Sequence, residues 1–149
     1  RLIHGPVVVG WGGQLRPDRY VVVDEALAGS EWEQDLYRLG VPDGVGLEFL
    51  SPESAREHLE EWRDSPLRTV VLTRGLPQML ELAQGGTMEG EEVNLGGLHA
   101  REGKEEVLSF LFLDEGDRAR LEALAAEGVT VSARDLPGSP RTSLASLLR

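Results

Sequence analysis

The sequence predicts an α/β fold, with a doubly wound, mostly parallel open sheet and helices on both faces. Apolar, β-branched runs recur at intervals of roughly 20 to 25 residues, and most segments between them carry helix signals. The runs do not alternate strictly with polar residues, which is typical of strands buried on both faces of a parallel sheet. With 149 residues, the chain is expected to form a single domain over residues 1–149.

The first element that the pattern predicts is a helix beginning directly after His4. Pro6 suits the first helical position, and apolar residues follow at helical spacing at Val8, Trp11 and Leu15. In a fold of this class such a loop normally follows a strand. We therefore expect the first strand of the sheet to lie upstream of Arg1 and to be missing from this sequence.

Strands and further helices are expected to alternate along the rest of the chain. Ser30 stands three residues before Glu33, which is the spacing of a capping box, and Ser51 precedes a proline that suits a helix start. Asp114 is positioned to cap a helix that ends at Gly128. A last helical turn is expected near 144–148, and the expected strands cover 20–23, 45–50, 69–72, 93–95, 108–113 and 129–131.

The net charge of the chain argues against some classes of binding partner, nucleic acid above all. Lys and Arg total 15 against 26 Asp and Glu, which gives a net charge of −11. A surface this acidic repels phosphate backbones, so nucleic acid is not an expected partner. The chain has 0 cysteines, which excludes disulfides and thiolate chemistry, and no apolar run is long enough to span a bilayer. Any association with a membrane is therefore expected to go through a partner.

Three histidines are the side chains that titrate closest to neutral pH. His58 lies in a charged helical stretch and is assigned no role, because a solvated helix face explains it. His99 follows a glycine-rich turn and suits either a site or an ordinary loop. The spacing of the histidines does not match a metal-ligand pattern, and no metal is expected.

His4 stands out because of its neighbours. The first amides of a helix and the positive end of its dipole attract anions, and the guanidinium of Arg1 can bind a phosphate through two hydrogen bonds. An imidazole placed there can accept a phosphoryl group. These residues alone equally allow a loop histidine that packs against Trp11.

Gly96 and Gly97 follow the expected strand 93–95, at the carboxyl end where ligands bind in this architecture. They indicate either a close approach of the backbone to an anion or a plain turn. The glycines at 10, 12 and 13 lack the spacing of a dinucleotide fingerprint. The sequence contains neither a G-x-S-x-G nucleophile elbow nor a G-K-[ST] phosphate loop.

The start of the chain, Arg1-Leu2-Ile3-His4-Gly5, resembles the start of the IIB component in the mannose/fructose/sorbose family of the sugar phosphotransferase system. The resemblance extends over nearly the whole chain. Four further segments are similar to family motifs in the same order, namely residues 21–26, 40–45, 93–98 with the Gly103-Lys104 that follows, and 128–131 with Arg134 and Pro137.

This resemblance implies a cytoplasmic phosphocarrier that joins the inner face of the membrane through its permease. His4 would take a phosphoryl group, on Nδ1, from a phosphohistidine of the IIA component and pass it to a sugar held by the membrane components IIC and IID. Arg1 would stabilise the phosphate, and neither a cofactor nor a metal is implied. Matching motif positions nominate further residues of the phosphate loop or of a partner-binding surface: Gly5, Pro6, Asp24, Asn94, Gly96 and Gly97.

The sequence departs from the family at Pro6, where the family has glutamine. Proline removes an amide side chain and a backbone N–H from the loop, so slower transfer or a different choice of partner is expected. Two alternatives stay open, a regulatory phosphocarrier without transport and a non-enzymatic α/β module that binds a small anion. Self-association also stays open, because Trp32, Phe49 and Trp62 suit an interface as well as a core.

Overall fold

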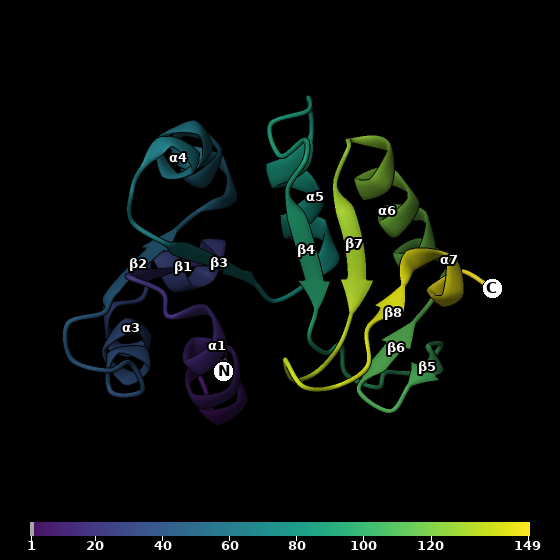
Figure 1. Cartoon of the computed structure of the whole chain (residues 1–149), viewed down its shortest axis with the longest axis horizontal. Coiled ribbons are helices and arrows are strands. Elements are labelled where there is room, and N and C mark those ends of the chain that lie inside the picture. Colours follow the sequence, from purple (N-terminus) through teal and green to yellow (C-terminus); the bar gives the residue numbers. More distant parts are fainter. Residues whose placement is uncertain (1) are drawn as a thin grey trace. The chain divides into compact units, whose positions relative to one another are not determined.

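The computed structural model describes residues 2–149, which fall into two compact units (Figure 1). The first unit ends at Arg74, and the second covers Gly75–Arg149. Each unit has its own strands and helices and is described by itself. The expectation of one domain over residues 1–149 stays a prediction.

The first unit is built on a three-stranded parallel sheet in the order β2-β1-β3. Strand β1 (Arg19–Val23) is central, with β2 (Gly46–Leu50) and β3 (Thr69–Thr73) on either side. Residues 21–23 of β1 are fully buried. The predicted parallel strand buried on both faces is thus confirmed for β1, where three consecutive valines leave neither face polar.

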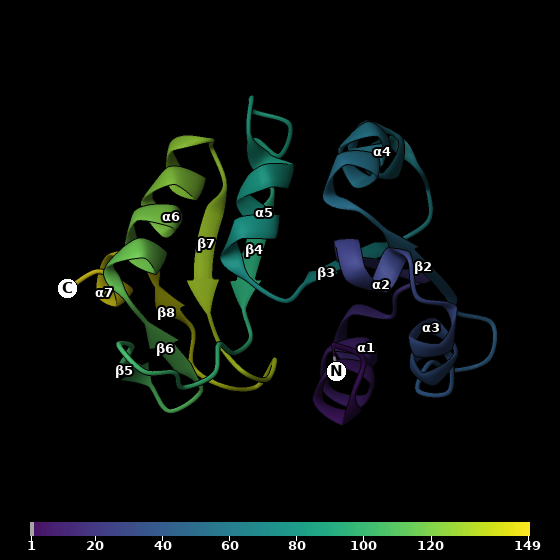
Figure 2. The ribbon, with the colours of Figure 1, turned by 180° about the vertical axis from the view of Figure 1, so that it is seen from behind.

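Helices cover both faces of this sheet. Figures 1 and 2 show α4 on one face and α1 and α3 on the other. The helical segments of the unit are η1 (Pro6–Trp11), α1 (Gly12–Leu15), α2 (Glu25–Ala28), α3 (Glu31–Arg38) and α4 (Pro52–Asp64). Under the face that carries α3 lies a core cluster of Ile3, Tyr20, Val22, Leu27 and Tyr37.

The second unit contains two smaller sheets. In one, β4 (Glu92–Leu95) runs parallel to β7 (Thr130–Ala133), and β8 (Thr142–Ser143) pairs antiparallel with β7. Helices α5 (Leu76–Ala83) and α6 (Glu115–Ala126) lie side by side on one face of the β4–β7 pair (Figures 1 and 2). The second sheet is a hairpin of β5 (Glu105–Leu108) and β6 (Leu111–Leu113), and α7 (Leu144–Leu147) ends the unit.

The α/β class and its parallel strands are therefore confirmed, but the strands of residues 2–149 form three sheets and not one open sheet. The predicted strand 108–113 is wrong, because the chain reverses after Leu108 and pairs Glu105 with Leu113. A residue outside the hairpin stabilises this turn, since the Phe110 carbonyl accepts a hydrogen bond from the Leu98 N–H at 3.0 Å. An apolar run does not reveal such a reversal.

The predicted helix starts are mostly confirmed. The Ser51 hydroxyl accepts a hydrogen bond from the Ser54 N–H at 3.1 Å, and Asp114 forms a complete capping box with Asp117. Helix α3 follows Ser30 as expected, but the Ser30 side chain makes no capping hydrogen bond within the described chain. None of the helices in residues 2–149 is long and apolar enough to cross a membrane.

Candidate functional site

His4 lies in the loop that leads into η1, and its side chain is exposed. Its carbonyl oxygen accepts a hydrogen bond from the Val8 N–H at 2.9 Å, so the helical path begins at the candidate residue. Pro6 occupies the first position of the helix, as predicted. Arg1, the expected phosphate ligand, lies outside the described residues.

The helix that starts here has an unusual form, because η1 is a π-helix that passes into the α-helical turn of α1. Three valines at 7–9 and glycines at 10, 12 and 13 are poor helix formers, so local propensity does little to enforce regular α-helical bonding. A Cβ atom on Gly12 would lie 2.8 Å from the Tyr20 hydroxyl oxygen, so this glycine is needed for packing. Gly12 thus has a structural explanation.

Partial burial lowers the pKa of His4 below its ordinary value of 6.5, because desolvation disfavours the charged imidazolium. The neutral imidazole is therefore the dominant form at neutral pH. A neutral imidazole has a free nitrogen lone pair, which is what a nucleophile needs to attack phosphorus.

The residue before His4 anchors this loop in the core. Ile3 is only 3% exposed and packs among the buried side chains of the first unit, which include Tyr37. Gly40 closes over it, since a Cβ atom at that position would lie 3.2 Å from Ile3 Cγ2. Gly5, in contrast, has open space around it and φ of −49°, so its position does not require glycine.

Asp24 stands at the carboxyl end of β1, where motif position and sheet geometry both place a candidate site residue. Its Oδ2 accepts a hydrogen bond from the Leu27 N–H at 3.0 Å and so caps α2. Its Oδ1 lies 3.6 Å from Nε of Arg74, which directly follows β3. The carboxylate therefore holds a guanidinium at the carboxyl edge of the sheet.

Asn94, Gly96 and Gly97 lie in the second unit, at the end of β4. The Asn94 amide is engaged with the backbone of Arg134. It donates to the Arg134 carbonyl at 3.0 Å and accepts from the Arg134 N–H at 3.2 Å. This pair extends the β4–β7 pairing beyond Ala133, so the side chain has a structural role whatever else it does.

The two glycines after β4 lie in an irregular segment and not in a turn, between β4 and the isolated bridge of Leu98 with Leu111. Their φ angles are not positive, and a Cβ on Gly97 would lie 3.4 Å from the Phe110 carbonyl oxygen. His4, Gly5 and Asp24 all lie in the first unit. The two glycines after β4 and Asn94 lie in the second.

Tyr37 and Arg74 are residues that the sequence reasoning missed. Tyr37 receives hydrogen bonds from the Leu2 N–H and from Arg74, at 3.3 Å and 3.4 Å. The position of Arg74 could have identified it from the sequence, because Arg74 and Asp24 each directly follow a strand of the same parallel sheet. The position of Tyr37 could not, since it reads as an apolar position of an amphipathic helix.

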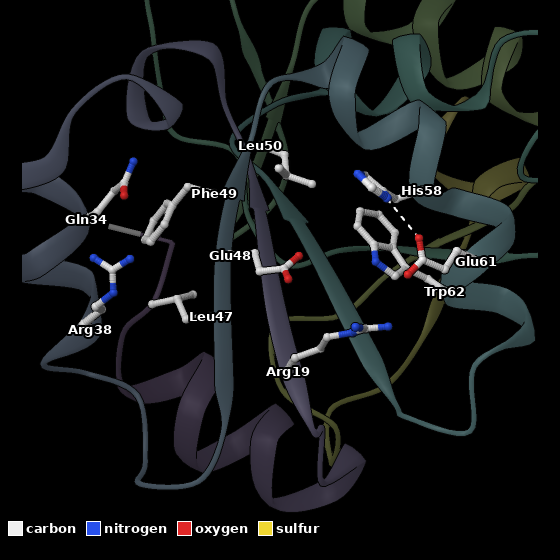
Figure 3. A pocket seen from close by; sticks show the side chains of 10 residues that line it. All are labelled: Arg19, Gln34, Arg38, Leu47, Glu48, Phe49, Leu50, His58, Glu61 and Trp62. Atoms are coloured by element: carbon white, nitrogen blue, oxygen red, sulfur yellow. Dashed lines mark hydrogen bonds and ion pairs between the residues drawn. The ribbon is translucent and has the colours of Figure 1, made fainter.

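A hollow in the first unit runs along the edge strand β2, between α3 and α4 (Figure 3). On the α4 side His58 stacks on Trp62 with ring centroids 5.7 Å apart, and its Nδ1 lies 3.1 Å from Glu61. Among the described residues, those predicted to form the site do not line this hollow. The hollow is therefore separate from the candidate site around His4.

Comparisons with known proteins point to one family. The family model for the "PTS system sorbose subfamily IIB component" matches residues 1–149. The chain is 28% identical over 145 residues to the N-acetylgalactosamine-specific phosphotransferase enzyme IIB component 1 of Escherichia coli, covering 97% of this chain and 90% of that protein. It is 25% identical to the mannose-specific EIIAB component of Escherichia coli, covering 99% of this chain and 46% of that protein.

Solved structures show the same fold. The crystal structure of the N-acetylgalactosamine-specific IIB component 1 from Escherichia coli matches with a TM-score of 0.86 and 28% identity, over 96% of this chain and 93% of that one. The IIB domain of the sorbose permease from Klebsiella pneumoniae matches with a TM-score of 0.85 and 24% identity, over 99% and 90%.

Proposed function

The chain belongs to the sorbose subfamily of PTS IIB components, the phosphocarriers of a sugar phosphotransferase system, and on this premise we propose that His4 is the residue that carries the phosphoryl group. The observation that carries the proposal is the exposed, predominantly neutral imidazole at the start of the helical segment 6–15. The first amides of a helical segment point back toward its start and favour an anion there.

In the first step a ring nitrogen of His4, Nδ1 by family resemblance, attacks the phosphorus of a IIA phosphohistidine. The P–N bond of the donor breaks as the new P–N bond forms, and one proton passes from the His4 ring to the donor imidazole. In the second step a sugar hydroxyl oxygen attacks phosphorus, the P–N bond of His4 breaks and the hydroxyl proton ends on the imidazole. Both steps leave the number of phosphoryl groups and protons unchanged.

The partners follow from these steps. A phosphorylated IIA component supplies the group, and a sugar bound by membrane IIC and IID components receives it at the cytoplasmic face of the membrane. We assign phosphate stabilisation to Arg1, with Gly5 and Pro6 in the phosphate loop. Asp24 acts at the edge of this site through Arg74, which it holds. Asn94, Gly96 and Gly97 are proposed as partner-binding positions.

The proposal is tested by incubating the chain with a phosphorylated IIA component and following the acid-labile label on it. The wild type should gain one phosphoryl group per chain, and His4→Ala should gain none. His58→Ala is the matched control, because His58 is a partly exposed histidine of the same unit with no proposed role. Undiminished labelling of His4→Ala overturns the assignment, and tight retention of inorganic phosphate without exchange would indicate an anion-binding module instead.

A further inference from the structure

The hydroxyl group of Tyr37 joins two segments that are distant in the sequence. The ring is buried, with 3% of the residue exposed, and it packs edge-on against Phe49 at a centroid distance of 5.6 Å. The hydroxyl oxygen accepts a hydrogen bond from the Leu2 N–H at 3.3 Å and another from Arg74 Nη2 at 3.4 Å. One buried atom therefore links the backbone of the His4 loop to Arg74.

The link continues to the carboxyl edge of the sheet. Arg74 Nε lies 3.6 Å from Asp24 Oδ1, and the other oxygen of Asp24 is occupied by the Leu27 N–H. Only 13% of the Asp24 side chain is exposed, whereas 53% of the Arg74 side chain is. The guanidinium is thus held from the protein side by two partners while part of it faces solvent.

We propose that Tyr37 is a positioning residue for phosphoryl transfer at His4, because its hydroxyl fixes the Leu2 backbone and couples that backbone to Arg74. The inference rests on the proposed function. Between Leu2 and His4 stands Ile3, whose side chain is anchored in the core. The loop is therefore held at two successive points, by a buried side chain and by a hydrogen-bonded amide, directly before the imidazole.

Removal of the Tyr37 hydroxyl is expected to lower the rate of phosphoryl transfer and not the number of phosphoryl groups that each chain accepts. Displacement of a reacting group by about 1 Å can cost on the order of 100-fold in rate, because attack requires a defined approach to phosphorus. Without the hydroxyl, the loop keeps its Ile3 anchor and loses the amide tether. Each molecule should then still accept a phosphoryl group, but more slowly.

The test compares Tyr37→Phe with the wild type, using phosphoramidate as a small phosphoryl donor and a phosphorylated IIA component as a protein donor. Phenylalanine keeps the buried ring and its contact with Phe49. We expect the maximal rate to fall about tenfold with both donors. The half-saturating donor concentration and the final stoichiometry should stay unchanged. Tyr20→Phe is the matched control, because it removes the hydroxyl of the other tyrosine in the same core cluster.

A second variant shows whether Tyr37 and Arg74 act through one connection. Arg74→Gln removes the charge from a side chain that is half exposed and so is not needed to fill the core. If the two residues act together, Tyr37→Phe combined with Arg74→Gln should be no slower than the slower single variant. Multiplying rate losses would show that they act independently and would overturn the coupling.

The remaining outcomes separate this inference from the proposed function. If the wild type takes up no phosphoryl group from either donor, the proposed function fails. If the wild type is labelled and Tyr37→Phe is labelled at the same rate, only the inference fails. A lower end-point together with a lower melting temperature would assign Tyr37 a purely structural role, which also overturns it.

Discussion

Gly40 packs directly against Ile3, and a methyl group on residue 40 would lie 3.2 Å from Ile3 Cγ2. This contact closes the core over the residue that precedes His4. Because Ile3 is 3% exposed and surrounded by buried side chains, it has little room to move. The absence of a side chain at position 40 is therefore part of what holds the His4 loop.

We expect Gly40→Ala to lower the free energy of unfolding by about 1 kcal/mol, at the mild end of over-packing a core. Urea unfolding followed by tryptophan fluorescence measures it. Gly13→Ala is the control, because that glycine lies in helix α1 with open space around it. This variant should raise the free energy of unfolding by a few tenths of a kcal/mol. Equal stability of the two variants would show that Ile3 moves to accommodate the added methyl group without lowering the free energy of unfolding.

The lowered pKa of His4 leads to a prediction about the pH at which its imidazole is protonated. Desolvation by burial disfavours the imidazolium, so the side chain should titrate below the ordinary value of 6.5. The neutral form then persists to lower pH than in an unfolded peptide. NMR titration of the ring protons, assigned by comparison with His4→Ala, measures the midpoint.

The same shift predicts the pH dependence of labelling. The rate of phosphoryl uptake from phosphoramidate should fall to half of its plateau at the midpoint measured by NMR, below pH 6.5, because only the neutral imidazole can attack phosphorus. The unfolded chain binds the proton more readily than the folded one, so this group also lowers stability as the pH falls through that window. A midpoint at or above 6.5 would contradict the partial desolvation of the imidazole.

The sequence predicted the elements that local chemistry determines. Three consecutive valines produced a buried central strand, and Ser51 and Asp114 marked the helix starts at which they cap. Motif spacing located His4 at the start of a helix. It could not indicate that the helix is a π-helix, because valines and glycines weaken regular α-helical bonding without specifying which helical form replaces it.

The rest of the candidate site depends on contacts between distant segments. Tyr37 meets Leu2 across 35 positions, and neither residue has a neighbour in sequence that signals the contact. The apolar run at 108–113 is split by a reversal that the Leu98 amide fixes from outside. Periodicity describes one segment at a time and so cannot reveal either feature.

Asn94 is expected to contribute to the stability of the second unit. Its amide makes two hydrogen bonds to the Arg134 backbone, so Asn94→Ala should lower the free energy of unfolding by about 1 to 2 kcal/mol. Asn94→Asp should also destabilise, because a carboxylate cannot donate to the Arg134 carbonyl. Ser132→Ala serves as the control on the neighbouring strand β7.

Hydrogen exchange provides the local measurement for this prediction. The amides of Arg134 and of the end of β7 should exchange faster in Asn94→Ala, while those of β1 in the first unit should not change. Unchanged exchange at Arg134 would mean that the side-chain pair adds nothing to the backbone pairing. Labelling of this variant by phosphorylated IIA then tests its proposed partner-binding role separately from stability.

The Lys104 ammonium lies 2.8 Å from Oδ2 of Asp117, a residue that is 5% exposed in the first turn of α6. Burial alone would raise the pKa of Asp117, but the hydrogen bonds from Lys104 and from the Asp114 backbone outweigh it and hold the pKa below 3.8. The folded state thus binds this proton less readily than the unfolded state. The stabilisation is complete well above pH 3.8 and is lost as the pH falls through that value toward the lowered pKa.

Asp117→Asn should therefore cost about 3 kcal/mol at neutral pH, because it leaves the Lys104 charge without its partner. The cost should shrink as the pH falls below 3.8, which urea unfolding at a series of pH values measures. Glu105→Gln is the matched control, since Glu105 pairs with Arg118 at 3.6 Å with 75% of its side chain exposed. That variant should change stability by less than about 0.5 kcal/mol. A pH-independent cost of Asp117→Asn would contradict the lowered pKa of Asp117, because both the Lys104 ion pair and the Asp114 hydrogen bond favour the charged carboxylate.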